Sequence, residues 1–157
     1  MTREEEYALE SLWHEIWHNR QTGNAGIKTL EPQHPTRRFA ETLNQAVARL
    51  TYPRFLERLG GTASHQAWVL ENGYSYSRTV RRLWAIVRRC GLDPVGVAGD
   101  FAAINAQGNL LSATDLMAKQ LAKRSGIGKA MIHAALDALS VRDDAAFTAL
   151  LDDIKSL

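Results

Sequence analysis

Apolar residues in this chain recur three and four positions apart, and no stretch shows sustained strict alternation of apolar and polar residues. The first spacing places side chains on one face of an α-helix, whereas alternation is typical of a half-buried strand. The segment near the N-terminus shows the helical pattern, with an inward apolar stripe expected at Leu9, Leu12, Trp13, Ile16 and Trp17. The sequence therefore predicts an all-α, multi-helix single domain with seven or eight helices.

Capping residues and helix breakers predict where these helices begin and end. Thr2 and Glu5 form a capping-box pattern that predicts a helix to about Arg20, and the glycines and prolines of 23–35 predict an irregular connection. Pro53 suits the first turn of a short separate helix, where a backbone N–H is not needed. Further helices are expected at 36–50, 54–59, 75–90, 94–106, 113–124, 129–139 and 142–154. A loop is expected between the helices at 54–59 and 75–90.

Composition narrows the classes of protein and of site. A length of 157 residues fits one domain, since domains take about 100 to 200 residues. The net charge of +2 is too small to make nucleic acid the expected partner. Cys90 is the single cysteine, so the chain can form neither an internal disulfide nor a multi-cysteine zinc site. Any metal site must therefore use His, Asp and Glu side chains.

The N-terminal sequence and the apolar runs bear on the cellular location. The first residues, MTREEEYALE, are acidic where a signal peptide would be basic and then apolar. No run approaches the ~20 consecutive apolar residues that cross a bilayer. We therefore expect a soluble, cytoplasmic protein with no membrane partner.

One motif carries a specific chemistry. Residues 14–18 read HEIWH, the H-E-x-x-H pattern, inside the first predicted helix. His14 and His18 lie one turn apart on one helix face and can bind one Zn²⁺, while Glu15 can accept a proton from a zinc-bound water. The competing interpretation is two surface histidines on an amphipathic helix.

A catalytic zinc needs a third protein ligand, and an open position for water. Glu41 is the preferred candidate because it lies within the second predicted helix, where small residues allow close approach to the first. His34 and Glu31 are the alternatives, although His34 is more simply explained as a solvated loop histidine. The motif thus predicts a metal site of His14, His18 and Glu41 between two packed helices.

Two stretches around these residues resemble known zincins. The segment ETLNQAVARLTYP, from Glu41 to Pro53, is similar to the second ligand-bearing helix of gluzincin-like metallopeptidases of the ImmA type, with Asn44 and Pro53 one position early. The runs LWHEIWHNR, ETLNQAVARLTYPRFLERLGG and NGYSYSRTVRRL resemble a zincin-like region near minor head proteins of Mu-like phages and prophages, over residues 9–105.

This resemblance implies a zinc-dependent, peptidase-like hydrolase of phage or prophage origin, acting on a protein or peptide. It implies zinc ligands at His14, His18 and Glu41 and an acid/base at Glu15. It also implies a zincin-like helical domain over 1–106, with 107–157 as a C-terminal helical extension packed on it. The location would be the host cytoplasm or the virion.

One departure from the zincin pattern affects this hypothesis. Zincins place strands before the HExxH helix, and an edge strand forms one wall of the cleft, whereas 13 residues precede His14 here. Without an edge strand, substrate cannot be held by strand addition, so another chain is expected to complete the cleft. The alternative is a non-catalytic helical phage structural or interaction protein whose HExxH is inert or structural.

Two weaker signals remain. Tyr74 and the nearby Tyr76 lie in a loop, and Tyr74 is a candidate oxyanion stabiliser beside the zinc. Arginines also decorate the helix at 75–90, where a solvated face is the favoured interpretation over a nucleic-acid stripe. They are Arg78, Arg81, Arg82, Arg88 and Arg89.

Overall fold

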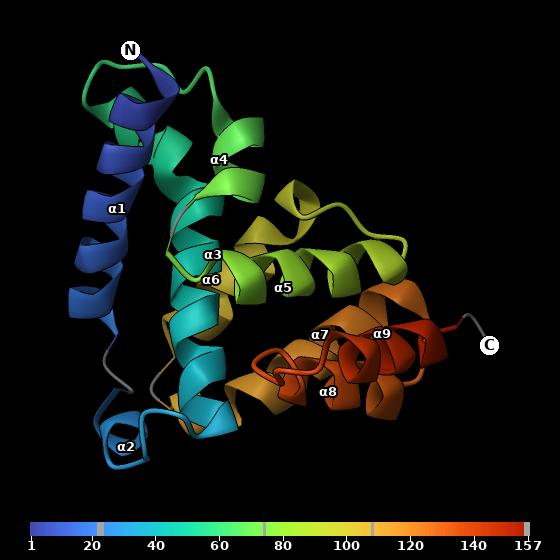
Figure 1. The fold of residues 1–157 in the computed structure, drawn as a ribbon. Coiled ribbons are helices and arrows are strands. Elements are labelled where there is room, and N and C mark those ends of the chain that lie inside the picture. The colour runs from blue at the N-terminus through green and yellow to red at the C-terminus, as the bar shows by residue number, and fades with distance from the viewer. Residues whose placement is uncertain (22–23, 74, 108, 156–157) are drawn as a thin grey trace.

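The computed structural model describes residues 1–21, 24–73, 75–107 and 109–155 (Figure 1). Over these residues the chain is helical with no strand, which confirms the all-α prediction. None of the described helices combines the length and the apolar character needed to cross a membrane. The elements are α1 (Arg3–Arg20), α2 (Asn24–Lys28), α3 (Pro35–Arg58), α4 (Gln66–Asn72), α5 (Ser77–Arg89), η1 (Val95–Val97), α6 (Ala98–Asn105), η2 (Leu110–Ser112), α7 (Ala113–Ser125), α8 (Lys129–Asp137) and α9 (Asp144–Asp153).

Helix α3 is the central element of the fold. It contacts α1, α4, α5, α6, α7 and α8. Figure 1 shows α1 and α3 as an upright antiparallel pair, with α5 and the C-terminal helices α7 to α9 extending to one side. Helix α1 therefore lies at the edge of the molecule, and its main neighbour is α3.

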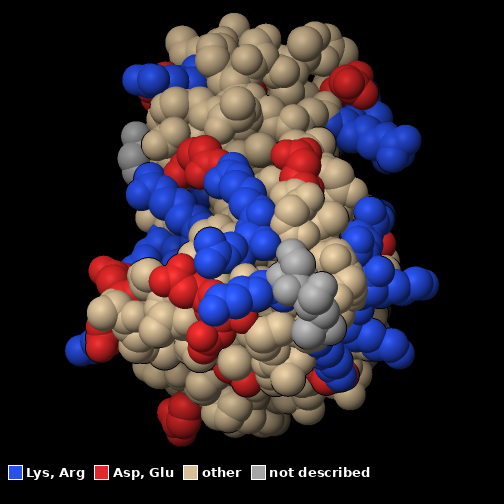
Figure 2. Space-filling view, turned by 90° about the vertical axis from the view of Figure 1, so that its right-hand side faces the viewer, with Lys and Arg blue, Asp and Glu red and all other residues tan. Residues whose placement is uncertain are grey.

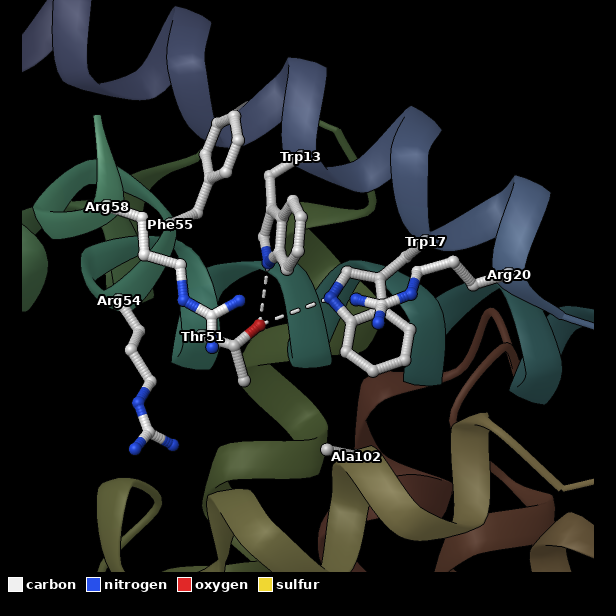
Figure 3. A pocket seen from close by; sticks show the side chains of 8 residues that line it. All are labelled: Trp13, Trp17, Arg20, Thr51, Arg54, Phe55, Arg58 and Ala102. Atoms are coloured by element: carbon white, nitrogen blue, oxygen red, sulfur yellow. Dashed lines mark hydrogen bonds between the residues drawn. The ribbon is translucent and has the colours of Figure 1, made fainter.

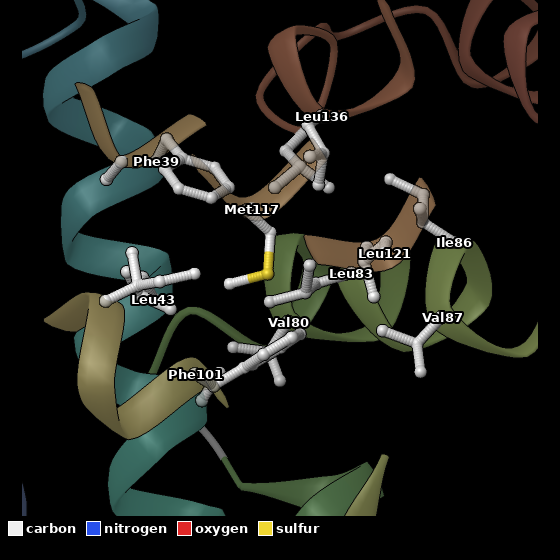
Figure 4. Close-up of a cluster of buried hydrophobic side chains, with 14 of the residues drawn as sticks. Phe39, Leu43, Val80, Leu83, Ile86, Val87, Phe101, Met117, Leu121 and Leu136 are labelled. Atoms are coloured by element: carbon white, nitrogen blue, oxygen red, sulfur yellow. The ribbon is translucent and has the colours of Figure 1, made fainter. Parts of the chain in front are cut away.

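The main hydrophobic core lies on the side of α3 away from α1. Figure 4 shows Phe39 and Leu43 of α3 meeting Leu83 of α5, Phe101 of α6 and Met117 of α7. The same buried cluster continues into α8 and α9, so residues before and after position 106 share one core. The C-terminal helices are thus part of the packing that holds α3 in place.

Helix α3 differs from the predicted pair of helices at 36–50 and 54–59, because it runs without a break through Pro53. Proline has no N–H to donate to the carbonyl four residues earlier. The side chain of Gln66 compensates, since its Nε2 donates to the carbonyls of Arg49 and Leu50, at 3.3 Å each. A residue from α4 thus donates to the Arg49 carbonyl, which Pro53 leaves without its helical donor.

The short helices were not expected. Helix α2 lies in the segment predicted to be irregular, and α4 lies where a loop is predicted. Each has fewer than eight residues, too few for an apolar stripe to repeat. Tertiary contacts with α3 therefore decide their structure more than local pattern does.

The buried face of α1 also differs from the prediction. Its buried residues are Glu6, Glu10, His14 and Trp17, whereas Leu12 of the expected apolar stripe is 51% exposed. Polar side chains can be buried when each finds a hydrogen-bond partner, and α3 supplies these partners. The helix therefore packs on a polar face at i, i+4 spacing.

The arginines of α5 bind other parts of the chain. Arg82 is only 6% exposed, so the predicted solvated face is wrong at this position. Its guanidinium donates to carbonyls before α9 and, with Arg78, to Asp144. Arg88 and Arg89 pair with acids of α4 and α9. On the face drawn in Figure 2, basic side chains accordingly lie beside acidic ones.

Arg49 is a fully buried cation that holds the loop between α4 and α5. Its guanidinium donates to the carbonyls of Leu70, Gly73 and Ser75, at 2.7 to 3.1 Å. A Cβ at Gly73 would lie 2.6 to 2.8 Å from three guanidinium atoms of Arg49. Only glycine fits at this position without displacing the arginine.

We therefore expect Gly73→Ala to destabilise the protein by about 1–3 kcal/mol, the usual cost of overpacking a buried site. Gly99→Ala is the matched control, because nothing lies within 4 Å of a Cβ at this helical position. It should be neutral or stabilising by up to about 1 kcal/mol. Urea unfolding measures both, and equal stability of the two variants would contradict the role assigned to Arg49.

Candidate functional site

The two histidines of the HExxH motif lie side by side on the face of α1 that packs against α3. Their ring centroids are 4.5 Å apart, with an angle of 89° between the ring planes. Because the helices are antiparallel, His14 lies opposite Asn44 and His18 lies opposite Glu41. The structure thus places His14 beside His18, and His18 against Glu41.

His18 and Glu41 are in direct contact. Nε2 of His18 lies 3.4 Å from Oε2 of Glu41, and the two side chains are 26% and 27% exposed. His14 is more enclosed, with 8% of its surface exposed. Solvent therefore reaches the site from the His18 and Glu41 side.

A chain of side-chain amides connects the two histidines through the protein interior. Oε1 of Gln21 lies 3.1 Å from Nδ1 of His18, and Nε2 of Gln21 donates to Oδ1 of Asn105 at 2.7 Å. Nδ2 of Asn105 donates to Oδ1 of Asn44 at 3.0 Å. Nδ2 of Asn44 lies 3.2 Å from the carbonyl oxygen of His14 and 3.3 Å from its Nδ1.

The direction of this amide chain follows from its last member. A backbone carbonyl only accepts hydrogen bonds, so the NH₂ group of Asn44 must face the carbonyl of His14. The oxygen of Asn44 then accepts from Asn105, and the oxygen of Asn105 accepts from Gln21. The oxygen of Gln21 is left to accept the Nδ1 proton of His18. In the neutral ring of His18, Nε2 consequently carries a lone pair that faces the Glu41 carboxylate.

Two electron-pair atoms facing each other at 3.4 Å repel unless a cation separates them. A proton on Nε2 of His18 meets this requirement, and so does a metal ion. Two ligands at 2.0–2.1 Å from a tetrahedral Zn²⁺ would be about 3.3 Å apart. The contact between His18 and Glu41 therefore has the spacing of two zinc ligands.

His14 has a different electrostatic environment. Burial, followed by the nearby charge of His18, lowers the pKa of His14 from 6.5 to about 4, so its ring is neutral at neutral pH. Neutral imidazole is the form that binds metals. However, Asn44 donates toward Nδ1, which leaves the ring proton on Nε2. Oε1 of the exposed Glu15 lies 3.9 Å from this Nε2.

Tyr76 is a further member of the site, whereas Tyr74 lies outside the described residues. The Tyr76 hydroxyl donates to Oε2 of Glu41 at 3.5 Å. Burial first, and the Glu41 carboxylate second, raise the pKa of Tyr76, so its phenol keeps its proton. Tyr76 has φ of 52°, and this costly left-handed conformation precedes α5 directly. The loop held by Arg49 leads into it.

The alternative third ligands lie elsewhere. His34 caps α3, where its Nδ1 accepts from the backbone N–H of Thr36 at 3.2 Å. Glu31 is exposed in the turn that precedes this cap. Neither residue joins the histidines of α1.

The donor set of two imidazoles and one carboxylate is chemically suited to zinc. Within the described ranges, however, no three His, Cys, Asp or Glu side chains form a group arranged to hold a metal ion. His18 and Glu41 have the spacing of two zinc ligands, whereas the proton on Nε2 of His14 occupies the position through which this ring would bind the metal. Zinc binding through Nε2 of His14 would require the ring proton to move to Nδ1, which the Asn44 amide now faces as a donor.

Comparison with known proteins adds no relative. No family model matches the chain, and searches of curated proteins and of solved structures found no match. The interpretation of the site therefore rests on its own geometry.

We expect the His14 ring, in the presence of a chelator, to titrate with a pKa of about 4 and to carry its proton on Nε2 when neutral. Because the pKa of His14 is lower in the folded state, the unfolded state takes up the proton first as the pH falls. The His14 ring therefore lowers the free energy of unfolding as the pH drops from 6.5 to about 4. ¹H–¹⁵N NMR of the ring nitrogens reports both properties. An inflection near 6.5 would contradict the burial assigned to this ring.

Proposed function

We propose that His14, His18 and Glu41 bind Zn²⁺ and that the protein is a zinc-dependent hydrolase that acts on a protein or peptide. The observation that carries the proposal is the contact between the His18 lone pair and the Glu41 carboxylate, which requires a cation and has the spacing of two zinc ligands. The HExxH motif and its resemblance to zincins support the same chemistry.

Each side chain has a role in such a reaction. A bound zinc ion would polarise a carbonyl and lower the pKa of a water to about 7. The exposed Glu15 carboxylate, next to His14, can accept the proton of the attacking water. The Tyr76 phenol keeps its proton and can donate to the oxyanion that develops on the substrate. The amide chain holds the His18 ring in orientation, as ligand-supporting residues do.

The protein or peptide substrate would need a binding surface that these helices supply only in part. The described residues include no strand that could pair with an extended peptide. We therefore propose that a second chain completes the cleft beside the exposed edges of His18 and Glu41. The phage or prophage origin is a proposal that rests on the sequence resemblance alone.

A second candidate is a non-catalytic helical interaction protein, and one observation favours it. The amide of Asn44 donates toward Nδ1 of His14 and so places the ring proton where a metal would bind. In that case Nε2 of His18 is protonated and forms an ion pair with Glu41, and the polar contact between α1 and α3 is purely structural.

Zinc titration separates the two candidates. We expect one high-affinity zinc per chain, and Glu41→Gln should weaken binding by about 10-fold or more because the anionic ligand is lost. Glu31→Gln is the control and should bind zinc as the wild type does. At a hundredfold excess over Kd, zinc should add about 2.7 kcal/mol to the free energy of unfolding. Equal affinity of the two variants, measured by calorimetry, would exclude Glu41 as a ligand.

Hydrolysis tests the role of Glu15 separately. Glu15→Gln should retain zinc and stability but should hydrolyse unfolded casein about 10²–10⁴-fold more slowly, because the proton acceptor is lost. Glu57→Gln removes another exposed glutamate, from α3, and should be without effect. If zinc binds and Glu15→Gln cleaves casein at the wild-type rate, Glu15 is not the base. If zinc binds and no variant cleaves casein, the metal is structural.

A further inference from the structure

A pocket lies between α1, α3 and α6, lined by Trp13 and Trp17, each of which directly precedes one histidine of the HExxH motif. It has a volume of about 420 Å³, within the size range of small-molecule sites. The ring of Trp13 stacks on Phe55 with a centroid distance of 4.6 Å and an angle of 12°, and Trp17 meets Trp13 edge to face at 5.9 Å. The wall of the pocket is therefore aromatic.

The polar groups of this wall are already occupied. The indole N–H groups of Trp13 and Trp17 both donate to Oγ1 of Thr51, at 2.8 and 3.2 Å (Figure 3). Thr51 in turn donates to the carbonyl of Val47 at 2.7 Å. These bonds fix the aromatic rings and leave no free donor on them. Polar recognition in the pocket must come from its arginines.

Three arginines line the pocket without an acidic partner. Arg20 comes from α1, and Arg54 and Arg58 lie one turn apart on α3. Over the described part of the chain, none of the three forms an ion pair with a carboxylate, in contrast to Arg82 and Arg88 of α5. In Figure 3 Arg58 and Arg20 reach inward from opposite sides, and Arg20 also lies over Trp17 at 5.3 Å.

We propose that this pocket binds an organic phosphate with a planar ring, of the nucleoside monophosphate class. Arg20 and Arg58 bring positive charge to the pocket without an acidic partner among the described residues, and a phosphate group offers up to two negative charges and three acceptor oxygens to meet it. Guanidinium groups suit phosphate because their paired N–H donors match its oxygens. The partly exposed rings of Trp13 and Phe55 supply apolar surface for a planar base, and Arg20, which lies over Trp13 at 5.8 Å, borders that surface.

The probe is adenosine 5′-monophosphate, measured by calorimetry on the intact chain. It should bind at least about tenfold more tightly than adenosine, which lacks the phosphate that the arginines bind, or inorganic phosphate, which lacks the base that packs on the aromatic rings. Arg58→Gln and Arg20→Gln should each weaken binding by about tenfold or more. Lys123→Gln removes an exposed charge from α7 and should leave the affinity unchanged. All three replaced residues are exposed, and thermal unfolding checks that the variants remain folded.

A short single-stranded oligonucleotide distinguishes the two sources of such a ligand. Binding tighter than that of the mononucleotide, and lost in Arg58→Gln, would mean that the pocket takes one unit of a strand, and weaker binding would mean a free nucleotide. Mononucleotide affinity that is unchanged in both arginine variants, or absent, would overturn the proposal. Chelator and Glu41→Gln should not alter this affinity, so the result is independent of the zinc site.

Discussion

The contact between α1 and α3 depends on buried polar side chains that satisfy one another. Glu6 is fully buried and accepts hydrogen bonds from the Tyr52 hydroxyl and from the N–H groups of Ser64 and His65. One turn later, burial raises the pKa of Glu10 to about 7. Polar groups buried without partners would cost about 1–3 kcal/mol each. A shift of one helix along the other would separate these partners, so the buried polar contacts favour the observed register.

The candidate site lies at the end of this polar contact. Glu6, Glu10 and His14 each have partners within the protein, although Oε2 of Glu10 is buried without one among the described residues, whereas His18 and Glu41 face each other at the solvent edge and need a cation between them. The amide chain links this pair to the interior, and the Arg49 loop brings Tyr76 onto the same carboxylate. A contact that fixes the packing of two helices therefore also fixes the geometry of a chemically reactive cluster.

The sequence predicted the fold class, and it placed His14, His18 and Glu41 on two helices that do pack together. It did not predict which face of α1 is buried, because an apolar stripe is counted from apolar residues and the partners of Glu10 and His14 lie on another helix. Pro53 was misread because Gln66 compensates for it from α4. The amide chain joins positions more than 60 residues apart in sequence, which no local pattern encodes.

Crystals grown with zinc and measured at the zinc absorption edge would test the central claim most directly. The account predicts one anomalous peak between Nε2 of His18 and Oε2 of Glu41, about 2.0–2.1 Å from each, with Nε2 of His14 as the third ligand. The ring proton of His14 would have moved to Nδ1, and Glu15 would remain unbound to the metal. Absence of a peak there, with His18 and Glu41 still in direct contact, would mean that a proton is the cation and that the site is structural.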